Sequence, residues 1–157
     1  MATKKKTKVA KKATTKKTAR TAVAKTKKAS KKASTSKAAP TAKPLGPYTP
    51  VVRAGDWIIV SGQLGIADGK VVSGGVAAQT TKAIENLKGQ LASVGANLSD
   101  VSKTLCFLTD MDTFASFNTA YVAGFGNSRP ARSTIGVASL PFGGAVEIEA
   151  WAYKPLR

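Results

Sequence analysis

Two charged residues near the carboxyl end of the chain lie where apolar residues would pack better. Arg132 precedes a β-branched run, and Glu147 interrupts the apolar segment 145–153. A guanidinium can bind a carboxylate through two parallel hydrogen bonds, and a carboxylate can orient or activate water. The chain has no histidine and one cysteine, Cys106, which argues against a zinc site, a Ser-His-Asp triad and Cys-His catalysis. We therefore expect any acid–base or anion-binding chemistry to use groups such as Arg132 and Glu147.

The charge of the chain is concentrated at its amino end. The 157 residues carry 25 Lys and Arg against 8 Asp and Glu, a net charge of +17. Residues 1–43 hold sixteen of the basic residues and no acidic one, which leaves residues 44–157 nearly neutral. The first segment consists almost wholly of Lys, Ala, Thr and Ser and has no aromatic residue. Because it cannot bury enough apolar surface to offset its conformational entropy, we predict a disordered basic tail.

The composition of the tail favours a polyanionic partner. A dense row of lysines releases counterions from a polyphosphate, which gives sequence-independent binding that weakens with salt. The tail resembles the lysine-alanine tails of linker histones and bacterial histone-like proteins, so we expect nucleic acid as the partner. A solubilising role, or binding to acidic proteins or membrane lipid, stays open. No aromatic residues interleave the lysines, which argues against a site that reads single-stranded bases.

Targeting signals are not evident in the sequence. No apolar segment follows the lysines as in a signal peptide, and no stretch approaches the roughly 20 apolar residues of a membrane span. A lone cysteine cannot form an intrachain disulfide and is compatible with a reducing compartment. We expect a cytoplasmic protein that could associate with the nucleoid through its tail.

Residues 44–157 predict one α+β domain with the element order ββαβαββ and both helices on one face of a mixed sheet. Gly95 is placed to end the first helix, and Asp112 or Thr113 to cap the second. The predicted strands are 56–62, the segment VVSGG after an Asp-Gly turn, 101–110, 131–138 and 145–153; the predicted helices are 75–94 and a segment through Phe114, Phe117, Tyr121 and Phe125.

The last strand predicts a subunit interface. Its residues alternate between a small apolar set, suited to the helix-covered core, and a set that mixes two carboxylates with two large aromatic residues. The mixed set is unusual for a surface that faces only solvent, and it suits an interface with polar pockets. We therefore expect the uncovered face of the sheet to associate with further copies of the chain. The mixed set is Glu147, Glu149, Trp151 and Tyr153.

Residues 46–157 resemble the RidA/YjgF family of reactive-intermediate deaminases. The matching pieces are GPYTP, IIVSGQLG, AAQTTKAIENLKGQLASVGANLSDV, KTLCFLTD, and RPARSTIGVASLP followed by VEIEA. The resemblance implies a chorismate-mutase-like fold and a homotrimer with a central barrel and three active-site clefts between subunits.

The same resemblance implies catalytic roles. Arg132, in PARS, matches the arginine that holds the substrate carboxylate; an interface ion pair, for example with Glu147, is the alternative. Glu147, in VEIEA, matches the glutamate that orients or activates the hydrolytic water. Glu149, two residues further on, is the competing candidate, for a purely structural role.

The resemblance also implies a substrate-binding set. Tyr48 and Ser61 match pocket-lining positions, although Tyr48 could instead be a packing residue and Ser61 a turn former. Gly62 would keep the floor of the pocket clear, and Thr134 lies where some relatives carry cysteine. Cys106, on an apolar strand, is expected to be a small buried residue.

The implied reaction is hydrolytic deamination of 2-enamines and 2-imines, such as 2-aminoacrylate, to 2-oxoacids and ammonium, with no metal or cofactor. A nucleoid-associated protein in which a trimer clusters three basic tails is an alternative, because linked arms bind by avidity. A ligand-sensing or chaperone-like member without catalysis is another, and relatives have also been called ribonucleases.

Overall fold

The computed structural model describes residues 46–156. The predicted basic tail and its boundary with the domain lie outside these residues. Within the described part, no helix has the length and apolar character needed to cross a membrane.

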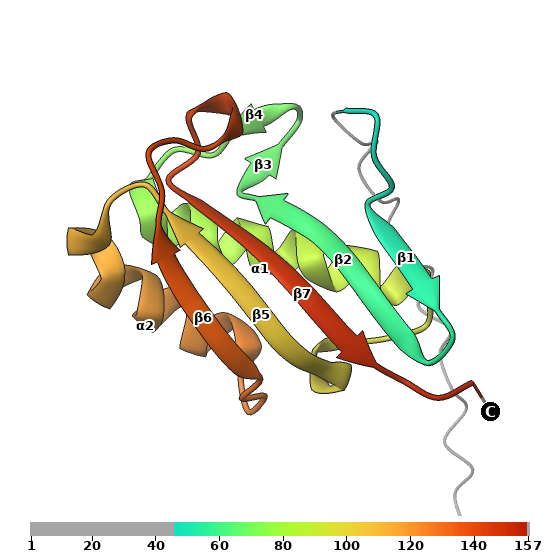
Figure 1. The fold of residues 1–157 in the computed structure, drawn as a ribbon. Helices are drawn as coiled ribbons and strands as arrows, with labels where there is room; N and C mark the ends of the chain where they lie inside the picture. The colour runs from blue at the N-terminus through green and yellow to red at the C-terminus, as the bar shows by residue number, and fades with distance from the viewer. Residues whose placement is uncertain (1–45, 157) are drawn as a thin grey trace, which may run out of the picture. The chain divides into compact units, whose positions relative to one another are not determined.

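The domain consists of a five-stranded sheet with two helices on one face (Figure 1). β5 and β6 are parallel, and the other neighbouring strands are antiparallel, so the sheet is mixed. The helices are α1 (Gly75–Ser93) and α2 (Phe114–Phe125). This architecture confirms the predicted α+β class. Across the sheet the strands follow the order β1 (Val51–Ala54), β2 (Trp57–Leu64), β7 (Val146–Tyr153), β5 (Val101–Leu108) and β6 (Ala131–Gly136).

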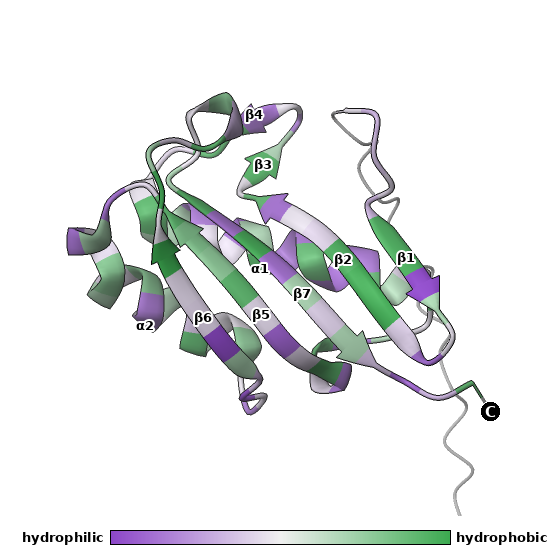
Figure 2. Ribbon diagram, in the orientation of Figure 1, coloured by the Kyte–Doolittle hydropathy of each residue, from purple (hydrophilic) through white to green (hydrophobic). Residues whose placement is uncertain are grey.

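The core lies between the sheet and the two helices. Every second residue of β7 is fully buried, as the alternation in the sequence predicts, and hydrophilic and hydrophobic residues alternate along this strand in Figure 2. These side chains join one cluster with apolar residues of both helices, among them Leu87 of α1 and Phe117 of α2. The buried set of β7 is Val146, Ile148, Ala150 and Ala152.

One predicted strand is wrong. The segment after the Asp-Gly turn contributes only β4 (Lys70–Val71), which pairs with β3 (Ile66–Ala67) in a separate two-stranded sheet. Asp68 and Gly69 both have positive φ, as a tight hairpin turn requires, so the turn itself is confirmed. A glycine pair begins α1 shortly after this hairpin and leaves no length for a longer strand. The first strand of the main sheet is instead β1.

The predicted end of α1 is confirmed. Gly95 has a φ of 75°, and the next residue, Ala96, donates its N–H to the Leu91 carbonyl at 2.8 Å. A residue in the left-handed region after the last helical turn is a common helix stop, and glycine adopts it without steric cost.

The predicted cap of α2 is right in position and wrong in contact, because Thr113 is the N-cap residue but its side chain makes no capping hydrogen bond. The Thr113 hydroxyl instead donates to the Asp110 carbonyl at 2.6 Å. The Asp112 N–H is itself capped, because the Asp110 carboxylate accepts it at 2.9 Å. The cap therefore serves the short helix η2 (Met111–Thr113), which comes directly before α2.

The uncovered face of the sheet carries large exposed side chains. Trp57, Ile59, Trp151 and Tyr153 are each between 41% and 47% exposed. Trp57 pairs with Tyr153 and Ile59 with Trp151 across β2 and β7. A contiguous exposed apolar patch of this kind indicates an interaction surface.

Candidate functional site

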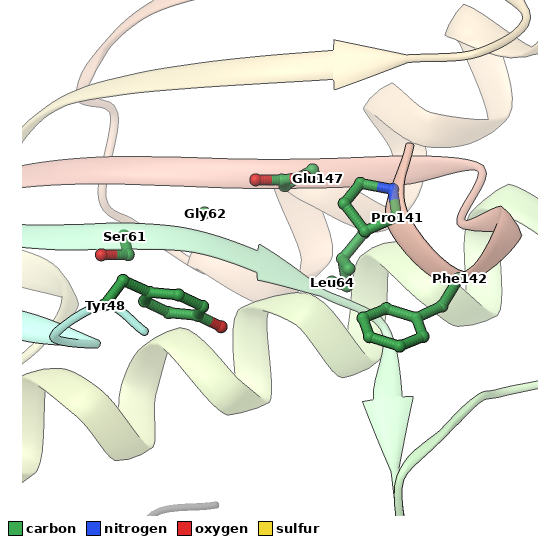
Figure 3. A pocket seen from close by; sticks show the side chains of 7 residues that line it. All are labelled: Tyr48, Ser61, Gly62, Leu64, Pro141, Phe142 and Glu147. Carbon is green, nitrogen blue, oxygen red and sulfur yellow. The ribbon is translucent and has the colours of Figure 1, made fainter. Parts of the chain in front are cut away.

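Four of the six predicted site residues line one pocket of about 460 Å³ (Figure 3). β2 and β7 supply its floor, the segment before β1 supplies Tyr48, and the short helix η3 (Pro141–Gly143) supplies an apolar rim. The pocket therefore gathers segments from both ends of the domain. Its lining is Tyr48, Ser61, Gly62, Leu64, Pro141, Phe142 and Glu147.

Gly62 makes room for the Glu147 carboxylate. The pairing of β2 with β7 shifts register between Val60 and Gln63, so that Ser61 and Gly62 lie in a bulge. A β-carbon added to Gly62 would overlap Oε1 of Glu147. The absence of a side chain at this position thus allows the carboxylate to lie across the strand and line the pocket.

The electrostatic environment favours the protonated form of Glu147 more than solvent does. Half-burial of this carboxyl raises its pKa above the ordinary value, and the nearby Glu149 raises the pKa further. Glu149 is engaged elsewhere, since its Oε1 accepts a hydrogen bond from Trp151 Nε1 at 2.7 Å. Of the two carboxylates on this strand, only Glu147 lines the pocket. A carboxylate with a raised pKa can take a proton from water more readily than an ordinary one.

Ser61 and Tyr48 bring hydroxyl groups to the pocket. The Ser61 hydroxyl donates to the Thr49 carbonyl at 2.8 Å, which leaves its oxygen as an acceptor. The Ser61 N–H donates to the Pro50 carbonyl at 2.9 Å and fixes this segment beside β2. Tyr48 is 46% exposed, and its phenol lines the pocket (Figure 3).

Arg132 lies away from this pocket. Its strand, β6, pairs with β5 so that Arg132 is opposite the buried Thr104, on the side covered by α2. Glu147 alternates with the buried residues of β7 and so faces the other side of the sheet. Among the described residues the ion pairs are Lys82–Glu85 and Lys154–Asp100, so an Arg132–Glu147 pair is not formed within one chain.

Helix α2 holds the Arg132 guanidinium. Nη2 of Arg132 donates to Oδ1 of Asn118 at 2.9 Å. The guanidinium carbon lies 4.6 Å from the ring centroid of Tyr121 and 5.4 Å from that of Phe117. Such cation–π contacts fix the plane of the guanidinium and leave its other N–H donors available.

A hydrogen bond to strand β5 fixes the Tyr121 ring in turn. Its hydroxyl shares a 2.7 Å hydrogen bond with Oγ1 of the buried Thr104. Burial raises the pKa of Tyr121 to about 12, so the phenol is neutral near pH 7. The sequence places Tyr121 on a predicted helix by its spacing and does not single out Asn118. The signal that could have found both was a phenol and an amide among the aromatic residues of one helix.

Thr134 lies beside Arg132 on β6 and does not line the pocket. It pairs with Cys106 across β5 and β6, two residues beyond Arg132 on the same face. Its Oγ1 is the one buried side-chain oxygen of the described residues without a hydrogen-bond partner. The predicted burial of Cys106 is confirmed, and burial raises the pKa of its thiol to about 11. One chain therefore presents two separate groups of predicted site residues.

Residues 46–156 contain no group of three or more Asp, Glu, His or Cys side chains arranged to hold a metal ion.

Comparisons with known proteins match most of the chain. Residues 36–154 match the family model described as endoribonuclease L-PSP. The mouse (Mus musculus) 2-iminobutanoate/2-iminopropanoate deaminase is 41% identical over 118 residues, which are 74% of this chain and 86% of the relative. The structure of RidA from an Antarctic Psychrobacter species is 37% identical with a TM-score of 0.68, and the match covers 71% of this chain and 91% of that one. Escherichia coli TdcF with bound serine is 31% identical with a TM-score of 0.66 and the same coverage.

Proposed function

The chain belongs to the RidA/YjgF family, whose model is described as endoribonuclease L-PSP, and we propose that it hydrolyses reactive 2-imino acids and their enamine tautomers. The observation that carries the proposal is the half-buried Glu147 carboxylate, which has a raised pKa and lines a pocket beside two hydroxyl groups. The name of the mouse relative supports the same reaction class. Serine bound in the structure of TdcF supports an amino-acid-like ligand.

The proposed reaction needs one base and one anion-binding group. Glu147 accepts a proton from water as the water oxygen bonds to the C=N carbon of the substrate. Glu147 returns this proton to the nitrogen of the carbinolamine, the C–N bond breaks, and the carbinolamine hydroxyl passes its proton to the departing ammonia. The protonated 2-imino acid and one water thus give a 2-oxoacid and ammonium. Arg132 binds the substrate carboxylate through its free N–H donors, as a planar guanidinium does. The Thr134 hydroxyl, on the same face, is available as a further substrate contact.

A second copy of the chain completes the site in this proposal. Arg132 and Glu147 face opposite sides of one sheet, so a single chain does not bring both groups to one substrate. The exposed patch around Trp57 and Trp151 supplies an apolar surface for association. A closed ring of copies would place the Arg132 of one copy beside the pocket of the next, and we propose a homotrimer.

The direct test of this function is release of 2-oxoacid from freshly generated 2-aminoacrylate. A rate above that of spontaneous hydrolysis is the expected result. A rate equal to the spontaneous one, with protein that is folded and oligomeric, would contradict the proposed function.

Tethering to nucleic acid is a second proposed function, and the charge distribution favours it. Sixteen of the basic residues lie in residues 1–43. Deletion of residues 2–43 should therefore abolish binding to random duplex DNA and leave both the trimer and the deaminase kinetics nearly unchanged. For the full chain, binding should weaken steeply between about 50 and 200 mM salt, because it depends on counterion release.

Gel shifts of the full chain and of the chain without residues 2–43, over a salt series, measure the contribution of the tail to DNA binding. Light scattering of the shortened chain measures its oligomeric state. DNA binding that survives the deletion, or no binding by the full chain at low salt, would contradict the role of the tail. A monomeric shortened chain would contradict association through the sheet.

A further inference from the structure

One flank of the pocket is apolar and comes mainly from η3. Leu64, Pro141 and Phe142 form this flank, and Figure 3 shows the Phe142 and Pro141 side chains extending from η3 beside Leu64 of β2. Phe142 is 60% exposed and does not belong to the hydrophobic core cluster. Its ring therefore contributes little to packing within the chain.

The backbone at Phe142 is strained. Its φ of 58° and ψ of 17° lie in the left-handed region, which a residue with a β-carbon rarely adopts. Such strain persists only where the surroundings impose it, and it is concentrated at functional sites. An exposed aromatic ring at a strained position, on the rim of a pocket, indicates a contact with something other than the core.

Neighbouring contacts fix the backbone of the loop that carries Phe142. The Gly144 N–H donates to the Pro141 carbonyl at 3.1 Å, and a β-carbon at Gly144 would come within 2.8 Å of Leu64 Cδ2. The Ala145 N–H donates at 2.7 Å to Oε1 of the buried Gln79 on α1. The loop is thus closed against β2 and anchored to the helix layer.

The pocket is large for the smallest 2-imino acids. Its volume of about 460 Å³ lies within the roughly 300–1,000 Å³ of pockets that enclose drug-sized ligands. In the proposed assembly a second copy takes part of this volume, but a three-carbon imino acid has only one methyl group to place against the apolar flank. A substrate with a bulky apolar side chain would fill the space against the apolar flank.

We propose that the flank of Leu64, Pro141 and Phe142 selects 2-imino acids with bulky apolar side chains, such as those formed by oxidation of leucine or phenylalanine. This inference rests on the proposed deaminase function and adds a substrate class to it. Glu147 activates the water that attacks the C=N carbon, and Arg132 of a second copy binds the substrate carboxylate. The substrate side chain then lies against Phe142. An apolar pocket discriminates between side chains by the methylene and ring surface that it buries.

The test compares kcat/KM for imino acids that an amino-acid oxidase generates from phenylalanine, leucine and alanine, followed by competition with semicarbazide. For the unmodified protein, kcat/KM should be at least about tenfold higher for the phenylalanine-derived than for the alanine-derived substrate. Phe142→Ala should lower this ratio about tenfold. Phe142→Gly should do the same while it also relieves the backbone strain, which keeps the test valid if the alanine variant folds poorly.

Leu156→Ala is the matched control, because Leu156 is also apolar and is 69% exposed but does not line the pocket. Its ratio should equal that of the unmodified protein. Equal kcat/KM for all three substrates, or an unchanged ratio in both Phe142 variants, would overturn the inference and leave the deaminase function standing. A change of oligomeric state in the Phe142 variants with an unchanged ratio would also overturn it, since the ring would then contact a second copy. No hydrolysis of any substrate would overturn the proposed function and this inference with it.

Discussion

Replacement of Arg132 with alanine is expected to lower kcat/KM for 2-imino acids by at least about a hundredfold. In the proposed mechanism the substitution removes a charge-assisted, two-point contact with the substrate carboxylate. This contact is worth about 3 kcal/mol, and 1.36 kcal/mol corresponds to a factor of ten. The fold should survive, because Arg132 is only partly buried, and the ring beneath it keeps its own hydrogen bond to Thr104. Steady-state rates with an oxidase-generated imino acid measure the effect.

Two further variants separate charge from geometry. Arg132→Lys keeps the charge but loses the planar donor pair, and it should remain at least about tenfold below the unmodified protein. Arg129→Ala removes the same charge from an exposed loop, where the side chain donates to the carbonyls of Gly126 and Ser128. It should retain nearly full activity. Activity of Arg132→Ala within about threefold of the unmodified protein, which is about 0.7 kcal/mol, would contradict the assigned role.

Replacement of Glu147 with glutamine is expected to lower kcat by about a hundredfold or more and to change KM much less. Glutamine keeps the shape of the side chain and removes the base, and general-base catalysis contributes about 10²–10⁴-fold. Glu149→Gln is the matched control on the same strand, because its carboxylate bonds to Trp151 and does not line the pocket. Equal losses of kcat in both variants would contradict the assignment of the base to Glu147.

The pH dependence gives a second readout of the same prediction. In the proposed mechanism the active form of Glu147 is the carboxylate, so activity should fall as the pH drops through its pKa. Because burial and Glu149 both raise that pKa, the fall should begin at a higher pH than for an ordinary glutamate. Glu149→Gln removes one of the two causes and should move the acid limb to lower pH. An acid limb that is the same in the unmodified protein and in Glu147→Gln would contradict the prediction.

Local sequence patterns predict most of the fold. The helical spacing along α1 and the alternation along β7 depend on the nearest few residues, so helix and strand can be recognised without the rest of the chain. The sequence patterns do not identify the edge strand β1, because this strand has only four residues and is half-exposed. The segment VVSGG also begins with two valines, but the hairpin and the glycine pair around it leave only Val71 of this segment paired. Chain geometry thus overrides the strand preference of the two valines in VVSGG.

The identities of the site residues could be predicted from the sequence. Which of them lie together within one chain could not. Whether Arg132 and Glu147 share a cleft depends on the pairing of β6 with β5 and of β7 with β2, segments that are far apart in sequence. The support of Arg132 by Asn118 likewise depends on how α2 packs against β6. No local periodicity encodes these contacts. The sequence also gave no reason to single out Phe142, since its backbone strain and exposure appear only in the folded chain.

The central claim, that two copies of the chain build each site, can be tested by complementation. Arg132→Ala and Glu147→Gln chains are each expected to be nearly inactive alone. If they are unfolded, mixed in equal amounts and refolded, about a quarter of the clefts in a cyclic trimer should combine an intact Arg132 from one copy with an intact Glu147 from the next.

Intact-mass measurement of the refolded material establishes that mixed oligomers have formed, and the deaminase rate is then compared with that of each parent. The predicted result is recovery to about a quarter of the rate of the unmodified protein, as random assembly of a cyclic trimer requires. Mixed oligomers with no activity above that of either parent would show that both groups act within one chain and would contradict the shared site.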